Sequence, residues 1–264
     1  MHRKYFFFDI DATLTDDATH KIIPSAEWTL HELERCGHFV SIATGRAHYK
    51  TVSFSDPIGI QNLVCCGGAC LVIDGDMKEN IPLPIDTAKQ LLRHAEEEKL
   101  GWVLMLDDSD AVYMRDYRFL ETAGRRTELT TYVYEPDLDP FALGEIFKIY
   151  MAVPKEEEYR YPWVNMQGHI RMGTYLNFQY DAKKDGILRM MKHVNGPLED
   201  VVVFGDAVND LVMFDPMWTS IAMGNGMEEL KKKADYVTAA NTDDGIYKAC
   251  RHFGWIEREC PFVK

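Results

Sequence analysis

Short apolar runs alternate with amphipathic helical patterns at both ends of the chain, and this alternation limits the possible folds more than any other feature. Near the N-terminus, the run YFFF at 5–8 precedes a helical pattern at 24–37, which Pro24 can open and Gly37 can close. Runs of four to seven apolar residues are typical of buried strands. Alternating strands and helices favour an α/β fold with a Rossmann-like, mostly parallel sheet that carries helices on both faces.

The middle of the chain follows a different pattern. After a helical segment, apolar runs come in neighbouring pairs, such as WVLMLD at 102–107 and AVYMRD at 111–116. Strands that follow one another without helices between them are typical of an antiparallel α+β unit. We therefore expect two domains: a core formed by residues 1–80 and 182–264, and an α+β domain inserted in it at 81–181.

Composition and charge narrow the classes of partner. The chain has 264 residues and a formal net charge of −13. This acidic balance argues against a nucleic acid or a membrane surface as partner, because both attract basic faces. The six cysteines match no zinc-binding spacing, and the first apolar run is too short for a signal peptide or a membrane span. We expect a cytoplasmic protein with reduced thiols, and the oligomeric state stays open.

Two aspartates, Asp9 and Asp11, stand where the first apolar run ends. In an extended chain residues i and i+2 point the same way, so both carboxylates are expected to project from the carboxyl end of the strand. In open α/β sheets this edge binds ligands. Neighbouring carboxylates repel unless a proton or a cation lies between them, and Mg²⁺ suits such oxygen ligands. Taken alone, the pair is more simply explained as the start of a solvated loop.

A second motif, Thr44-Gly45-Arg46, ends a later apolar run. A hydroxyl and backbone N–H groups at a strand-to-helix junction can bind a phosphate group. The same Thr-Gly pair also serves as an ordinary helix cap, so the motif by itself is a weak signal.

Two more motifs lie in the C-terminal part of the chain. GDAVND at 205–210 follows an apolar run and would add carboxylates at the same edge of the sheet. Lys183 and Lys184 begin a helical pattern, where a cation opposes the helix dipole. We therefore expect one of the two lysines to have a role other than helix stability, and the other to lie on the surface.

Together, and in this order, these motifs resemble those of the haloacid dehalogenase-like (HAD) superfamily, and more narrowly of its Cof-type phosphatases. The family pattern is DxDGT, a strand ending in Thr-Gly-Arg, a lysine before a helix, and GDxxND. Ala12 stands where that pattern has glycine. The stretch 221–249 also looks like the family's C-terminal part. The resemblance is weakest over the inserted segment, whose size and position resemble the family's large cap domain.

The resemblance implies a Mg²⁺-dependent phosphatase that hydrolyses a small phosphorylated metabolite, such as a sugar phosphate or a cofactor phosphate. Asp9 would attack phosphorus and form an aspartyl-phosphate, while Asp11 would act as general acid and then as general base. The Asp9 carboxylate, the main-chain carbonyl of Asp11 and Asp206 would hold the Mg²⁺ ion.

The remaining site residues follow from the same resemblance. Lys184, chosen over Lys183 by its spacing to the following Gly-x-Leu, would neutralise the phosphate and orient Asp9. Arg46 would either contact the substrate or pair with an acid. The other phosphate-binding and supporting residues implied are Thr44, Gly45, Thr13, Asn209 and Asp210.

Other functions use the same features. A phosphotransferase or mutase would carry the same four motifs and pass the phosphoryl group to another hydroxyl. A non-catalytic regulator that binds Mg²⁺ and phosphate is suggested by Ala12, although the retained Asp9 and Asp11 favour an enzyme. A phosphorylated receiver domain is much shorter than this chain and lacks a large inserted segment.

Overall fold

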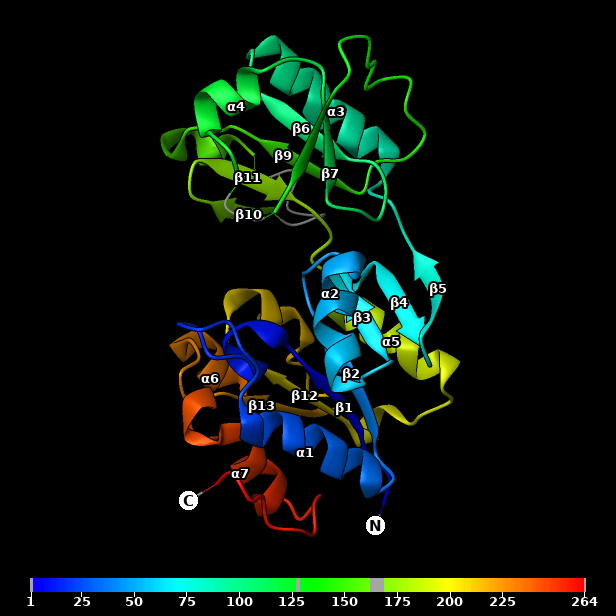
Figure 1. Cartoon of the computed structure of the whole chain (residues 1–264), viewed down its shortest axis with the longest axis vertical. Coiled ribbons are helices and arrows are strands. Elements are labelled where there is room, and N and C mark those ends of the chain that lie inside the picture. Colours follow the sequence, from blue (N-terminus) through cyan, green and yellow to red (C-terminus); the bar gives the residue numbers. More distant parts are fainter. Residues whose placement is uncertain (1, 127–128, 162–168, 264) are drawn as a thin grey trace. The chain divides into compact units, whose positions relative to one another are not determined.

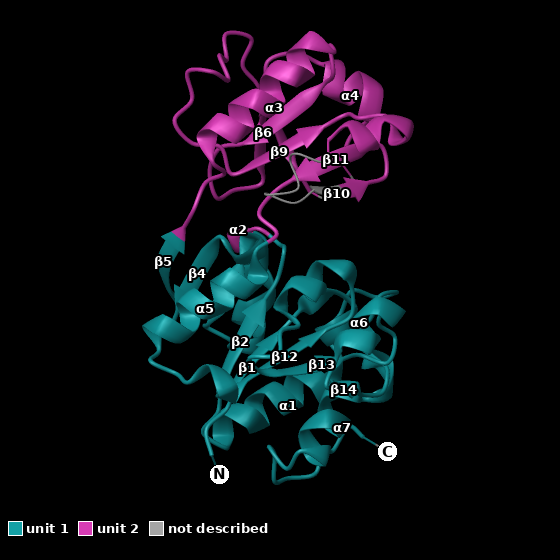
Figure 2. Cartoon of the chain, turned by 180° about the vertical axis from the view of Figure 1, so that it is seen from behind, with its two compact units in different colours: residues 1–46, 50–79, 182–264 teal, residues 47–49, 80–181 magenta. Residues whose placement is uncertain are grey.

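The structure is a computed structural model of the chain, and it describes residues 2–126, 129–161 and 169–263. The chain forms two compact units, each described by itself below (Figure 2). Unit 1 comprises residues 1–46, 50–79 and 182–264, and unit 2 comprises residues 47–49 and 80–181. Within the described ranges, no helix combines the length and the apolar character needed to cross a membrane.

Unit 1 is built on one eight-stranded sheet with the order β14-β13-β12-β1-β2-β3-β4-β5 (Figure 1). The pairs from β14 through β3 are parallel, and β3 pairs with β4 in the antiparallel direction. This arrangement confirms the predicted α/β fold with a mostly parallel sheet. The strands are β1 (Tyr5–Phe8), β2 (Phe39–Ala43), β3 (Leu63–Cys65), β4 (Cys70–Ile73), β5 (Asp76–Asn80), β12 (Val201–Gly205), β13 (Thr219–Ala222) and β14 (Tyr236–Val237).

Helices cover both faces of this sheet, which explains why β1 is apolar at every position. Phe6 packs in one buried cluster with Leu30 of α1, and Phe7 packs in another with Ile187 of α5. Successive residues of β1 therefore enter opposite halves of the core. The helices of this unit are α1 (Pro24–Arg35), α2 (His48–Ser55, whose first two residues group with unit 2), α5 (Lys183–His193), α6 (Glu228–Lys233) and α7 (Gly245–His252).

Unit 2 contains a six-stranded sheet with the order β10-β11-β9-β6-β7-β8. Its pairs are antiparallel, as expected, except for the parallel pair β7–β8. One buried cluster includes Leu91 of α3, and a second includes Phe119 of α4. The elements are α3 (Ile85–Glu97), β6 (Trp102–Met105), β7 (Ala111–Met114), α4 (Arg118–Ala123), β8 (Thr131–Tyr134), β9 (Lys148–Met151), β10 (His169–Met172) and β11 (Tyr175–Phe178).

Candidate active site

The carboxyl end of β1 lies between those of β2 and β12, so the motif residues that follow these strands meet at one edge of the sheet. The backbone N–H of Asp9 donates to the carbonyl of Phe204 in β12 at 3.1 Å. The N–H of Thr44, which follows β2, donates to the carbonyl of Val64 in β3 at 2.8 Å. The hydrogen bonds between neighbouring strands thus continue to the first residue of each motif, and they fix the position of that residue at the edge of the sheet. This is the edge at which open α/β sheets bind ligands.

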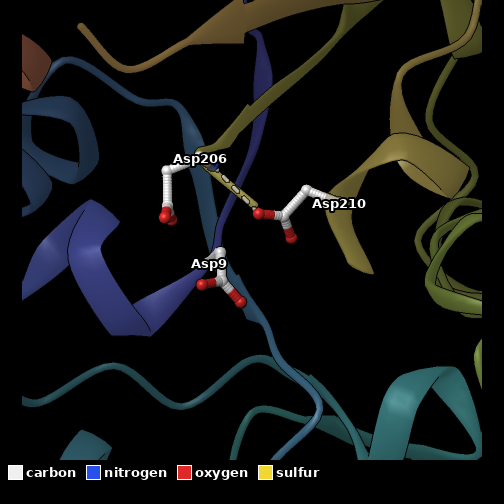
Figure 3. A group of neighbouring side chains, drawn as sticks. All are labelled: Asp9, Asp206 and Asp210. Atoms are coloured by element: carbon white, nitrogen blue, oxygen red, sulfur yellow. Dashed lines mark hydrogen bonds between the residues drawn. The ribbon is translucent and has the colours of Figure 1, made fainter. Parts of the chain in front are cut away.

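Three carboxylates gather at this edge, and we call Asp9, Asp206 and Asp210 the aspartate group (Figure 3). One carboxylate oxygen of each lies within 4.8 Å of the others, and all three residues are buried. Thr13 donates its hydroxyl hydrogen to Asp206 Oδ1 at 2.8 Å. Buried acids at such short range require a cation or a shared proton to offset their repulsion.

Asp210 folds back onto the end of β12. Its Oδ2 accepts the backbone N–H groups of Asp206 at 2.9 Å and of Ala207 at 3.1 Å. A Cβ atom at position 205 would lie 2.7 Å from the Asp210 side chain, so only Gly205 leaves room for this approach. The glycine of the GDAVND motif is therefore what lets Asp210 join the group.

The cation inside the group is Lys183, and the prediction that Lys184 faces the site was wrong. Lys183 Nζ donates to Asp9 Oδ1 at 2.7 Å and to Asp210 Oδ1 at 2.6 Å, and its side chain is 1% exposed. Lys184 instead pairs with Asp215 at 2.6 Å and is 34% exposed.

Helix geometry explains this choice. Neighbouring helical residues point about 100° apart, whereas residues three apart share a face. Gly186 sets the face of α5 that meets the sheet, because a Cβ atom there would lie 2.5 Å from Val64 Cγ1. Lys183 lies three residues before Gly186, so it points inward, and Lys184 points outward.

Asp11 does not join the aspartate group. Its carboxylate accepts two hydrogen bonds from Arg46, from Nε at 3.0 Å and from Nη2 at 2.5 Å, and its side chain is 56% exposed. The prediction that the carboxylates of Asp9 and Asp11 project together was wrong for a local reason. Strand β1 ends at Phe8 and the chain turns at Ile10–Leu14, so the two-residue period of a strand no longer applies. Of the two roles expected for Arg46, pairing with an acid is the one observed.

Ala12 occupies the left-handed region, with φ 57° and ψ 5°. An L-residue pays a steric cost there that glycine avoids, which gives the glycine of the family pattern a physical reason. The carbonyl of Ala12 accepts a hydrogen bond from Asn225 Nδ2 at 2.8 Å. The sequence did not indicate Asn225, because no pattern links an amide in the C-terminal part to a turn near residue 12.

Substituting Ala12 tests this backbone strain. We expect Ala12→Gly to change the free energy of unfolding by less than about 1 kcal/mol, since relief of the left-handed cost is offset by the freedom of glycine in the unfolded chain. Ala12→Val should destabilise the fold by more than about 1 kcal/mol, because a β-branched residue fits this region poorly. Urea unfolding of both variants measures this, and a valine variant as stable as the parent would contradict the assignment of strain.

Three other residues predicted for the site belong to the same motifs, but the hydrogen bonds described here do not link them to the aspartate group. The hydroxyl of Thr44, which is buried, accepts the backbone N–H of Arg46 at 3.2 Å. Gly45 follows it and is half-buried, and Asn209 is half-buried in the helical turn Val208–Met213.

The electrostatics of the aspartate group reflect burial first and mutual repulsion second. Burial, together with the charge of Asp210, raises the pKa of Asp9 to about 8 and that of Asp206 to about 7. Burial alone would lower the pKa of Lys183, but the charges of Asp210 and Asp9 outweigh it and raise this pKa. Three carboxylates thus face one ammonium, which leaves excess negative charge when all are ionised.

Two oxygens in the group are open to a further ligand. Lys183 and Thr13 occupy Asp9 Oδ1 and Asp206 Oδ1, while no donor among the described residues bonds to Asp9 Oδ2 or Asp206 Oδ2. Hard cations such as Mg²⁺ prefer carboxylate oxygens of this kind. The donor set therefore fits a divalent cation held by Asp9 and Asp206.

The raised pKa values predict how the metal-free fold responds to pH. Both carboxyls hold their protons more tightly in the folded chain than at the ordinary pKa of 3.8, so the folded state binds more protons than the unfolded state between about pH 4 and pH 8. The free energy of unfolding should therefore fall as pH rises through this window. Urea unfolding in EDTA should show a steeper fall for the parent than for Asp206→Asn, and equal slopes would speak against the assignment.

Comparison with known proteins agrees with this geometry. Residues 6–250 match the profile of the haloacid dehalogenase-like hydrolases. The chain is 33% identical to the Bacillus subtilis protein named "Putative phosphatase YkrA", over 97% of this chain and all of that one. It is 26% identical to 5-amino-6-(5-phospho-D-ribitylamino)uracil phosphatase YitU of Bacillus subtilis, over 93% and 95% of the two chains.

Comparison with a solved structure shows that the fold is also similar. The HAD subclass IIB sugar phosphatase BT4131 superposes with a TM-score of 0.74 at 26% identity, over 96% of this chain and all of that one. The family match extends through both units, from β1 to α7, and includes all four motifs. By sequence and by fold, this chain belongs to the haloacid dehalogenase-like hydrolase family.

Proposed function

We propose that this protein is a Mg²⁺-dependent phosphatase that hydrolyses phosphate monoesters of small metabolites through an aspartyl-phosphate on Asp9. Membership of the family and its relation to named phosphatases make the chain a phosphoric monoester hydrolase. One observation carries the finer proposal: buried Asp9 has one oxygen fixed by Lys183, while its other oxygen accepts no hydrogen bond from the described residues.

Asp9 has the environment of a nucleophile. Lys183 holds Oδ1 at 2.7 Å, which leaves Oδ2 to attack phosphorus. In the first step the Oδ2–P bond forms and the bond from phosphorus to the ester oxygen breaks, so an alcohol leaves. In the second step water attacks phosphorus, and the Asp9 carboxylate and inorganic phosphate are released.

Asp9 and Asp206 would hold the Mg²⁺ ion through their open oxygens, with the Asp11 main-chain carbonyl as a further ligand. Asp210 uses its oxygens on Lys183 and on two backbone N–H groups, which favours a supporting role over direct ligation. Bound Mg²⁺ would offset the repulsion between the carboxylate and a dianionic phosphate. A cation there would also lower the pKa of Asp9, so that the nucleophile is ionised at neutral pH.

Asp11 is the proposed general acid and base. It would exchange its contact with Arg46 for the leaving oxygen of the ester, give that oxygen a proton, and later take a proton from the attacking water. Arg46 would then be free to meet the substrate. Thr44 and the N–H of Gly45 are the proposed phosphate ligands, and Thr13 and Asn209 are proposed to support the site.

The relatives suggest a range of substrates. YitU is named for a phosphorylated ribitylamino compound, and BT4131 is described as a sugar phosphatase. We propose a small phosphorylated metabolite as substrate and unit 2 as the cap that selects it, which corresponds to the inserted domain expected at 81–181.

Release of inorganic phosphate from a panel of sugar, polyol, nucleotide and cofactor phosphates tests this function. We expect at least one compound to be hydrolysed with Mg²⁺, with release lost in EDTA and restored when Mg²⁺ is returned. Equal release with and without Mg²⁺ would contradict the metal's role. Transfer of the phosphoryl group to an added alcohol in place of water would favour a phosphotransferase.

A further inference from the structure

Unit 2 carries a buried polar cluster formed by Lys148, Asn177 and Gln179, which we call the amide cluster. All three residues are at most 8% exposed. Asn177 of β11 pairs with Tyr150 of β9, and Lys148 lies two residues before Tyr150, so the cluster lies on one face of the sheet. The same face carries apolar side chains of β6 such as Val103, which pairs with Tyr150. Burying polar groups among apolar side chains costs free energy of folding unless the groups form hydrogen bonds.

The hydrogen bonds of the cluster fix the orientation of both amides. The Lys148 ammonium can only donate, and it bonds to Gln179 Oε1 at 2.8 Å. Asn177 Nδ2 donates to the same oxygen at 2.8 Å. Since Gln179 presents its oxygen, Asn177 must present its nitrogen. The lysine therefore sets the orientation of Gln179, and Gln179 in turn sets that of Asn177.

One acceptor is left over. Asn177 Oδ1 is buried and has no hydrogen-bond partner among the described residues. A buried acceptor without a partner costs roughly 1–3 kcal/mol, whereas leucine in its place would cost nothing of this kind. Because none of the described residues supplies a donor, an amide retained at such a position points to a donor from a bound ligand.

The surroundings limit what that donor can be. An anion such as a carboxylate would suit Lys148 but has no hydrogen to give to Asn177 Oδ1. An ammonium group could donate, but it would add a further positive charge beside those of Lys148 and Arg126, whose guanidinium lies 3.9 Å from the ring centroid of Tyr150. A neutral hydroxyl donates to Asn177 and is not repelled by these charges.

We propose that the amide cluster is a binding site for a hydroxyl-rich group, a sugar or polyol, in which one hydroxyl donates to Asn177 Oδ1. The group could be a free polyol or the alcohol part of the substrate. The second case rests on the proposed phosphatase function, and the first does not.

Two variants of Asn177 separate binding from a structural role. Asn177→Leu removes both the donor and the acceptor, while Asn177→Asp keeps an acceptor and removes the donor to Gln179. If the only role of Asn177 is its hydrogen bond to Gln179, both variants lose that bond and should show the same loss of binding or activity. Ser220→Ala serves as a matched control, because it also removes a buried unpaired oxygen, but in unit 1.

Two measurements distinguish a free polyol from the alcohol part of the substrate as the bound group. Calorimetry with D-glucitol reports a free polyol, and kcat/KM for D-glucitol 6-phosphate relative to hexyl phosphate reports the substrate. We expect Asn177→Leu to weaken glucitol binding, or to lower that kcat/KM ratio, by about fivefold to tenfold, with Asn177→Asp and Ser220→Ala close to the parent.

The outcomes are separable from those of the proposed function. If the parent hydrolyses neither ester but hydrolyses another compound of the panel, the phosphatase proposal stands and calorimetry alone decides the site. If it hydrolyses no compound at all, the phosphatase proposal fails, and calorimetry again decides the site. If hexyl phosphate is hydrolysed but Asn177→Leu changes neither the ratio nor glucitol binding, the amide cluster is not a hydroxyl site and an ordered water is the partner of Asn177. Equal losses in Asn177→Leu and Asn177→Asp would assign Asn177 a structural role and overturn the proposal.

Discussion

Replacing Asp9 by asparagine is expected to lower the rate of phosphate release by at least about a thousandfold. Asparagine has the same shape but lacks the charge and nucleophilic oxygen that attack phosphorus. The loss should appear in kcat, because the step removed is bond formation. The variant should stay folded, since an uncharged asparagine avoids both the burial of a charge and the repulsion by Asp210, the two causes that raise the pKa of Asp9 to about 8.

The matched control is Asp215→Asn, which removes the same charge from the partner of Lys184. We expect its kcat to stay within about twofold of the parent, since a partly solvated ion pair outside the aspartate group contributes little. Stopped assays of inorganic phosphate with Mg²⁺, together with circular dichroism of each variant, make the comparison. A folded Asp9→Asn enzyme with more than a tenth of the parent's kcat would exclude Asp9 as the nucleophile.

Removing the two neighbouring lysines is expected to have very different effects on stability. Lys183→Met should lower the free energy of unfolding by about 3 kcal/mol or more, because it leaves Asp9 and Asp210 buried without their cation. Lys184→Met should cost less than about 1 kcal/mol, because its pair with Asp215 is partly solvated.

Urea unfolding at pH 8 measures both lysine variants under the same conditions. At pH 5 the cost of Lys183→Met should shrink, because the orphaned carboxyls can take up protons. Equal costs for the two variants, or a larger cost for Lys184→Met, would contradict the buried position of Lys183. Turnover should follow the same order, with loss in Lys183→Met and little change in Lys184→Met.

The sequence predicted what depends on local pattern. The fully apolar run of β1 and the alternation around it were sufficient for a parallel sheet with two covered faces. Motifs that follow adjacent strands necessarily meet at one edge, which is why Asp206 could be placed near Asp9 from the sequence.

What the sequence did not predict depends on contacts between distant segments. The choice between Lys183 and Lys184 is set by how Gly186 packs on Val64, which spacing alone does not reveal. The direction of Asp11 depends on a turn that begins one residue after Asp9. The pairing of Asn225 with the carbonyl of Ala12 spans 213 residues and has no pattern of its own.

The inserted unit was the least predictable part. Helix α4 and strand β8 lie in a stretch without clear periodicity, and neither was expected. Residues 47–49 group with unit 2 although they follow the second motif directly. Contacts such as the one between His48 Nδ1 and Asp108 Oδ2, at 2.6 Å, join these residues to unit 2. Composition does not indicate such contacts.

The most direct test of the central claim is capture of the phosphoryl group on the enzyme. A hydrolysed substrate labelled with ³²P is mixed with enzyme and Mg²⁺ and quenched in acid within milliseconds. Label on the protein that hydroxylamine releases, that maps to the peptide containing Asp9, and that is missing from Asp9→Asn is the predicted result. Turnover of the same substrate with no labelled enzyme at any quench time, under conditions that trap a known aspartyl-phosphate, would contradict the account.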